Sequence, residues 1–278
     1  MNDTQTTTNP LGYEKIGKLL TSYAIPSIIA LIINSLYNMV DQIFIGQGVG
    51  FLGNGATNII APIATITIAI ATLFGDGLAA FFSLSLGKGE GEKAAKGLGT
   101  SIMFGSVFGI IWTVLAFAFL KPLCLIFGAT ENILPYALDY GRIIVIGFTF
   151  QIVGNTINSA IRTDGNPRYA MLSMMIGAVL NIILDPVFIF VFHWGVEGAA
   201  TATVISQLFG LLFNIAYLFR MKTIRLSRQS FTLDIRIAAR IASLGFASGA
   251  NNLTSTVVAF VSNNLMTKYG ALSPYGAD

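Results

Sequence analysis

The stretch GLGTSIMFGSVFGIIWTVLAFAFL, from Gly97 to Leu120, contains no charged side chain, although Lys96 precedes it and Lys121 follows it. A helix needs about 20 apolar residues to cross the hydrocarbon core of a lipid bilayer, which is about 30 Å thick. This stretch is long enough and apolar enough to do so. We therefore predict a membrane-spanning helix here, and we apply the same test outward along the chain.

Seven segments pass this test, and each is separated from the next by a polar or charged connection. We predict spanning helices at 19–45, 55–86, 95–120, 132–161, 168–192, 196–220 and 237–267. The composition agrees, because 54% of the residues are apolar and only 10% are charged, whereas soluble domains carry about 25% charged residues. The sequence therefore excludes an ordinary soluble protein and predicts an all-α polytopic membrane protein.

The chain contains a single cysteine, Cys124, and a single histidine, His193. One cysteine excludes an internal disulfide, and one histidine excludes a multi-histidine metal site. His193 lies beside Trp194 at the end of a predicted span, where an interfacial anchor is the expected role. The net charge of +3 is small and indicates no nucleic-acid partner. We expect no enzyme activity and no cofactor, and we expect the lipid bilayer to be the main environment.

The basic residues fall mostly on alternate connections, which predicts the orientation of the chain in the membrane. With the N-terminus placed inside, thirteen lysines and arginines lie inside and three lie outside. The outer three are Lys121, Arg142 and Lys268. The polar start, MNDTQTTTNP, is not that of a cleaved signal peptide, so we expect the first apolar helix to remain. The N-terminus is predicted to be cytoplasmic.

The longest polar connection, RMKTIRLSRQSFTLDIR, separates six predicted helices from a seventh. Beyond it, Ser243–Ser248 weakly echoes Ser22–Ser27, and transporters are often built from two repeated halves. We therefore expect a chain that contains one six-helix lobe and the first helix of an incomplete second lobe. The expected parts are a cytoplasmic tail at 1–18, a transmembrane lobe at 19–220, a basic cytoplasmic linker at 221–236 and the seventh helix within 237–278.

Three carboxylates lie inside the predicted spans, namely Asp41, Asp76 and Asp185. An ionisable side chain in a membrane helix costs at least about 2.5 kcal/mol, so each is a functional candidate. Asp185 has the most apolar surroundings, and we expect its protonation or cation occupancy to change during function. Asp41 lies near an outer helix end and could instead be solvated. Asp76 lies between two glycines near the cytoplasmic side, where a structural role is favoured and its function is left open.

Four predicted helices each carry a stripe of polar side chains at helical spacing, which would place each stripe on one face. Such stripes are typical of a water-accessible cavity, although amides also serve as hydrogen-bonding contacts between membrane helices. The stripes are Asn34, Tyr37, Asn38 and Asp41; Gln151, Asn155, Asn158 and Arg162; Gly177, Asn181 and Asp185; and Thr203, Gln207, Gly210 and Asn214.

Prolines inside three predicted helices each remove one backbone hydrogen bond and leave a point at which the helix can bend. They are Pro26, Pro62 and Pro186. Many proline kinks are static, so we assign a hinge role only to Pro26, which lies on the same helix as Asp41.

Four segments together resemble the MATE (multidrug and toxic compound extrusion) family of transporters, prokaryotic type. They are YNMVDQIFIGQGVG (37–50), AIRTDGNPRYAM (160–171), NIILDPVFIF (181–190) and GVEGAATATVISQ (195–207). The resemblance implies a MATE-type fold in which two six-helix lobes face each other across a central cavity. It implies efflux of small molecules in exchange for H+ or Na+, in a bacterial cytoplasmic membrane, by a protein that is a monomer when full length.

The resemblance also implies a cation or proton site, which would hold Na+ if that ion is used. By resemblance its residues are Asp41, Asn181, Asp185 and Thr203, with Tyr37 and Asn158 nearby. The cavity-lining set is Asn34, Tyr37, Asn38, Gln151, Asn155, Asn158 and Gln207. Two alternatives stay open: a flippase for lipid-linked oligosaccharides, which would favour a more cationic cavity, and a membrane scaffold or fragment that does not transport.

Overall fold

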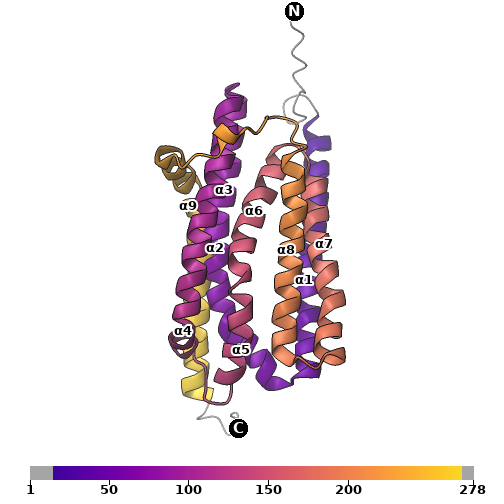
Figure 1. The fold of residues 1–278 in the computed structure, drawn as a ribbon, viewed down its shortest axis with the longest axis vertical. Helices are drawn as coiled ribbons and strands as arrows, with labels where there is room; N and C mark the ends of the chain where they lie inside the picture. Colours follow the sequence, from indigo (N-terminus) through magenta and orange to yellow (C-terminus); the bar gives the residue numbers. More distant parts are fainter. Residues whose placement is uncertain (1–14, 271–278) are drawn as a thin grey trace, which may run out of the picture.

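The computed structural model describes residues 15–270, and this part of the chain consists of helices and their connections, the longest of which joins α8 (Gly195–Leu218) to α9 (Ile235–Gly270), without a β-strand. Most helices run along the long axis of the molecule (Figure 1). The predicted tail up to residue 14, the last residues from 271 and the side chain of Lys268 lie outside the described part. The expectation of an all-α membrane protein is confirmed.

The helices follow the predicted segments closely, with differences of a few residues at their ends. They are α1 (Ile16–Gly48), α2 (Phe51–Gly87), α3 (Gly91–Ala118), α4 (Leu120–Ile126), α5 (Leu134–Ile144), α6 (Gly147–Thr163), α7 (Pro167–Pro186), η2 (Val187–Val191), α8 (Gly195–Leu218), η3 (Arg228–Ser230) and α9 (Ile235–Gly270).

Within residues 15–270, five helices are long and apolar enough to cross a membrane, and a sixth span results if the bent pair α5 and α6 counts as one. The seventh predicted segment is helical, as α9, but it is not among them. Its apolar residues alternate with glycine, serine, threonine and asparagine, which lowers its hydropathy. The formation of α9 is therefore confirmed, whereas its crossing of the membrane remains a prediction.

The fourth predicted span, 132–161, is not one straight helix, because α5 and α6 meet at an angle of 48°. At the break, the amides of Ile146 and Phe148 donate to carbonyls three residues earlier, Ile143 and Val145, instead of four. Such tighter turns interrupt the regular helix and change its direction. Counting apolar residues could not detect this break, because both halves are equally apolar.

The three prolines in the predicted helices have different local effects. α1 continues through Pro26 and α2 continues through Pro62, whereas α7 changes at Pro186 into the wider π-helical turn η2. π-helical turns occur frequently beside functional sites. Here the turn begins at Val187, two residues after Asp185, so the predicted weak point at Pro186 lies next to the most deeply buried predicted carboxylate.

Helix α2 is the central element of one side of the molecule, where it packs against α3, α6 and α9 (Figure 1). On the other side α1 packs along α7, and α7 packs along α8. Two glycines, Gly77 on α2 and Gly245 on α9, bring those two helices into backbone contact. A methyl group on Gly77 would overlap the carbonyl of Ile241, and one on Gly245 would overlap the carbonyl of Leu73. This close approach holds the first helix after the linker against the six-helix unit.

Candidate cation site

Two buried carboxylates meet where α1 packs against α7. Asp41 lies on α1 and is 8% exposed, and Asp185 lies at the end of α7 and is 0% exposed. The two carboxyl groups lie within hydrogen-bonding distance of each other. Two carboxylates this close repel each other unless a proton or a cation lies between them. The pair is therefore a site at which one positive charge can be held.

Two further predicted residues complete this cluster. The Asn181 amide, one helical turn before Asp185 on α7, donates to the Asp185 Oδ1 at 3.1 Å and to the Thr203 hydroxyl of α8 at 3.3 Å. Asn181 is 1% exposed, whereas Thr203 is half-buried. Three helices, α1, α7 and α8, thus supply the four residues that the sequence had predicted to lie together.

Several oxygen atoms in this cluster are buried without a hydrogen-bond partner among the described residues. They are the Oδ1 of Asp41, the Oδ2 of Asp185 and the Oδ1 of Asn181. A buried acceptor without a partner is costly, and most native proteins avoid it unless the atom has a function. Carboxylate and amide oxygens are the ligands that hard cations prefer. The cluster therefore fits a small hard cation, and the carboxylates equally fit a proton.

Two neighbours of the pair were not predicted from the sequence. The Gln42 side chain hydrogen-bonds to Asp41 and accepts from the Thr57 hydroxyl of α2 at 3.1 Å. Tyr140 on α5 is 9% exposed and interacts electrostatically with Asp41, Asp185 and Tyr37. Tyr37, which was predicted, also interacts with both carboxylates. A tyrosine within an apolar segment carries no spacing signal, which is why Tyr140 was missed.

The other predicted polar residues are spread along the helices rather than gathered at Asp185. Asn34 and Asn38 are exposed on α1 and bond to each other at 3.2 Å. Asn158 is 4% exposed, and its amide donates to the Ala170 carbonyl at 3.0 Å and the Ser173 hydroxyl at 2.9 Å. Ser173 lies about 18 Å along α7 from Asp185, so the expected proximity of Asn158 to the cation site is wrong.

Gln151, Asn155 and Gln207 are half-buried, and the Gln207 Oε1 has no hydrogen-bond partner in the described part of the chain. Asp76 is also half-buried and interacts electrostatically with Arg162, whose guanidinium donates to the Ser159 hydroxyl at 3.0 Å. An arginine neighbour across the α2–α6 contact supports the structural role that was favoured for Asp76.

A third buried carboxylate, Asp164 at the end of α6, was not singled out in the sequence. It is 1% exposed and accepts from the Tyr217 hydroxyl at 2.8 Å, the Lys222 amide at 3.0 Å and the Thr223 amide at 2.9 Å. The Thr223 hydroxyl donates to it as well. Asp164 therefore fixes the start of the linker to the ends of α6 and α8. It lies in the short connection between the predicted spans 132–161 and 168–192.

With this arrangement established, comparison with known proteins identifies the family. The MatE family model matches residues 26–187, which is more than half of the chain. The chain belongs to the MatE family. The match includes Asp41, Asn181 and Asp185, and it ends before Thr203 and the linker.

Two curated relatives of this MatE chain are named multidrug export protein MepA. The one from Staphylococcus saprophyticus is 27% identical over 93% of the chain and 58% of its own length. The one from Staphylococcus aureus is 26% identical, again over 93% of the chain and 58% of the relative. The chain thus spans about three fifths of the length of these proteins.

Solved structures of transporters give the same result for the fold. A multidrug resistance MATE family transporter of the MOP superfamily, in an outward-facing conformation, superposes with a TM-score of 0.86 at 26% identity. That superposition covers 98% of this chain and 61% of the solved one. An inward-facing conformation gives a TM-score of 0.80 at 27% identity, covering 90% of this chain and 58% of the solved one. The MatE chain is an integral membrane protein with this fold.

Proposed function

We propose that this MatE chain works as part of a secondary antiporter, which exports amphipathic or cationic organic compounds in exchange for H+ or Na+. The observation that carries the proposal is the contact between the Asp41 and Asp185 carboxyls, with oxygens left unpaired inside the bundle. Membership of the family and the multidrug export function in the names of the relatives support it. The protein is then a transporter rather than an enzyme, and its organic substrates are small molecules.

In this mechanism a cation or a proton enters from the outer side and neutralises the repulsion between Asp41 and Asp185. Asn181 and Thr203 hold the Asp185 carboxyl in place from α7 and α8. Binding of the ion therefore favours a conformation in which α1 and α7 stay close together. The release of the ion restores the repulsion and favours their separation.

Helix α1 carries both Asp41 and Pro26, so a bend at Pro26 would move Asp41 relative to Asp185. We propose Pro26 as the hinge of this movement, because its ring removes one backbone hydrogen bond inside a 33-residue helix. The polar residues along α1, α6 and α8 would then contact the organic substrate. We further propose a cytoplasmic N-terminus in a bacterial cytoplasmic membrane, on the basis of the thirteen basic residues on one side.

The test is transport of a fluorescent amphipathic cation into or out of liposomes that contain the protein, under an imposed Na+ or pH gradient. We expect dye movement that follows the gradient and stops when an ionophore collapses it. Dye movement of equal rate without any gradient would contradict antiport. Transfer of a labelled lipid-linked oligosaccharide between leaflets, with no movement of the dye, would instead support the flippase alternative.

A further inference from the structure

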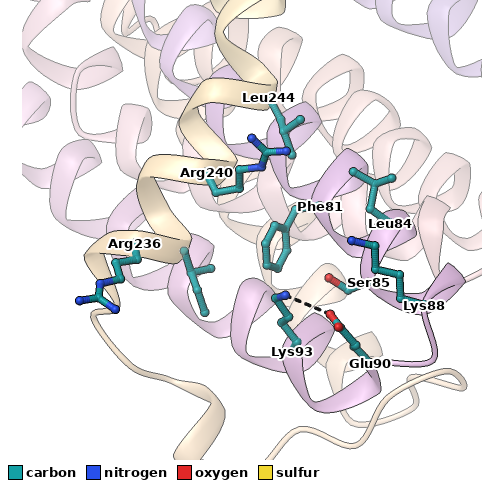
Figure 2. Close-up of a pocket in the computed structure, with 10 residues that line it drawn as sticks. Phe81, Leu84, Ser85, Lys88, Glu90, Lys93, Arg236, Arg240 and Leu244 are labelled. Carbon is teal, nitrogen blue, oxygen red and sulfur yellow. Dashed lines mark ion pairs between the residues drawn. The ribbon is translucent and has the colours of Figure 1, made fainter.

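A separate cavity lies at the other end of the molecule, where α2 ends, α3 begins and α9 begins. Its volume is about 260 Å³, and Figure 2 shows the residues that surround it. The lining includes two kinds of side chain, apolar and basic. The residues that matter here are Phe81, Leu84, Ser85, Lys88, Lys93 and Arg240.

The charge around this cavity is mostly of one sign. Four basic side chains, Lys88, Lys93, Arg236 and Arg240, accompany a single acidic one, Glu90. Glu90 pairs with Lys93 at 3.0 Å, and the other three basic side chains make no ion pair with the described residues. In Figure 2 the Arg240 guanidinium lies above the Phe81 ring and the Lys88 ammonium to its right, whereas Arg236 points away. The cavity therefore favours an anion.

The adjoining hollow differs in this respect. Its volume is about 570 Å³, and Glu90, Glu92 and Asp234 line it together with Lys93 and Lys96. Acidic and basic groups nearly balance there, so it offers an anion no clear preference. The anion preference belongs to the smaller cavity.

The walls of the smaller cavity are apolar, apart from one hydroxyl group. Phe81 is buried, Leu84 is 53% exposed and Leu244 is half-buried. Ser85 is 4% exposed, and its hydroxyl has no hydrogen-bond partner in the described part of the chain. An apolar wall, an unused hydroxyl donor and unpaired cations together match a ligand with an anionic head and an apolar tail.

The location of the cavity decides which ligand of this kind it meets. Helices α2 and α3 are both long and apolar enough to span a membrane, and the cavity lies at their junction, Lys88–Glu90. A junction between two spans lies at the boundary between the hydrocarbon core and water, which is where the phosphates of phospholipids lie. Basic pockets between membrane helices at this depth bind anionic lipid head groups.

We propose that this cavity binds the phosphate head group of an anionic phospholipid. Lys88 and Arg240 contact the phosphate, the Ser85 hydroxyl donates to it, and the first part of an acyl chain lies against Leu84 and Leu244. Because Arg240 belongs to α9 and Lys88 directly follows the last residue of α2, the lipid connects α9 to the six-helix unit. A role in setting the orientation of the chain in the membrane would explain the basic residues. It would not explain the apolar cavity or the unpaired Ser85 hydroxyl.

The experiment measures lipid binding to the detergent-solubilised chain by native mass spectrometry, with phosphatidylglycerol and phosphatidylcholine of identical acyl chains. We expect phosphatidylglycerol to bind at least about tenfold more tightly. The double variant Lys88→Gln/Arg240→Gln should weaken its binding by about thirtyfold, since each basic residue near a lipid surface contributes about 1 kcal/mol. Ser85→Ala should weaken it by about fivefold and leaves the charge unchanged, which separates the hydroxyl from general electrostatics.

The matched control is Arg225→Gln/Arg228→Gln, which removes the same charge from exposed linker positions outside the cavity. We expect it to bind phosphatidylglycerol like the unmodified chain. Equal loss in the control and the cavity variant would overturn the proposal, because binding would then depend on overall charge. Inorganic phosphate that competes as well as a soluble short-chain phosphatidylglycerol would also overturn it, since the apolar wall would contribute nothing. Neither result depends on whether the protein transports.

Discussion

Two buried carboxylates in this protein, Asp164 and Asp185, differ in how completely their oxygens are bonded. Asp164 is 1% exposed and accepts four hydrogen bonds, from Tyr217, Lys222 and twice from Thr223. Asp185 is 0% exposed and accepts one, from Asn181, while its second oxygen has no partner and a second carboxylate lies beside it. Burial alone therefore does not identify a functional carboxylate.

The difference indicates what each group does. Four donors bond to the two oxygens of Asp164, so it holds the linker in one position. Asp185 has too few hydrogen-bond donors around it to stabilise a buried negative charge, so the binding of a proton or a cation would stabilise it. We therefore interpret the first as a structural contact and propose the second as a binding site, although both are aspartates at helix ends.

The largest expected effect comes from Asp185→Asn. We expect the change to abolish gradient-driven transport and to weaken any Na+ binding by more than about a hundredfold, because it removes one of the two carboxylates that would hold the cation, and the loss of a charged partner from a buried ion pair costs about 3–5 kcal/mol. The folded protein should not lose stability, since the change removes a carboxylate with an unpaired buried oxygen. Transport assays and calorimetric titration with NaCl against choline chloride measure both effects.

The control for this prediction is Asp139→Asn, which neutralises a carboxylate whose side chain is 45% exposed on α5. It should transport and bind Na+ like the unmodified chain. If Asp185→Asn retained full transport, the contrast between the two buried aspartates would have no functional meaning.

The second prediction concerns Asp164, where we expect a substitution to lower stability and to leave Na+ affinity unchanged. Asp164→Asn places an amide hydrogen donor opposite groups that themselves donate, and we expect a loss of about 3 kcal/mol in the free energy of unfolding. Na+ affinity should stay within about twofold, because the cluster at Asp41 uses none of these groups. Thermal unfolding in detergent and the same calorimetric titration measure the two quantities. An unchanged unfolding temperature would show that the four hydrogen bonds contribute nothing.

The comparison also shows what the sequence could provide. The apolar runs predicted the helices, since the need for about 20 apolar residues is a property of the bilayer. Asp41, Asn181, Asp185 and Thr203 were found because charged and amide groups inside apolar segments are rare, and because the resemblance carried the same positions.

The features that could not be predicted from the sequence depend on contacts between segments that are far apart along the chain. Asp164 lies in a short polar connection, and only the folded chain brings the linker residues Lys222 and Thr223 onto it. The break between α5 and α6 cannot be read from the apolar residues, and the interaction of Tyr140 on α5 with the two carboxylates joins segments that are far apart in the sequence. Asn158 on α6 had the right spacing for the polar stripe, but it packs against Ser173, which lies about 18 Å along α7 from Asp185.

The third prediction concerns the proposed bend of α1 at Pro26, which would move Asp41 relative to Asp185. Pro26→Ala restores one helical hydrogen bond in α1, worth about 1 kcal/mol, and should slow transport about fivefold. Equilibrium Na+ binding should be unchanged, because Pro26 lies far along α1 from Asp41. Transport equal to that of the unmodified protein would mean that Pro26 is a static feature of α1.

The smallest expected effect compares two tyrosines, one beside each carboxylate site. Tyr217→Phe removes the hydroxyl that donates to Asp164 at 2.8 Å, and it should lower the free energy of unfolding by about 1–2 kcal/mol without changing Na+ affinity. Tyr37→Phe removes a hydroxyl that interacts with Asp41 and Asp185, and it should change Na+ affinity by about threefold with little effect on stability. Each variant is the control for the other. Both changes delete one hydroxyl from a buried or half-buried ring. Equal effects of the two variants on stability and on Na+ affinity would therefore contradict the distinction between Asp164, whose oxygens are fully hydrogen-bonded, and Asp185, one of whose oxygens has no partner.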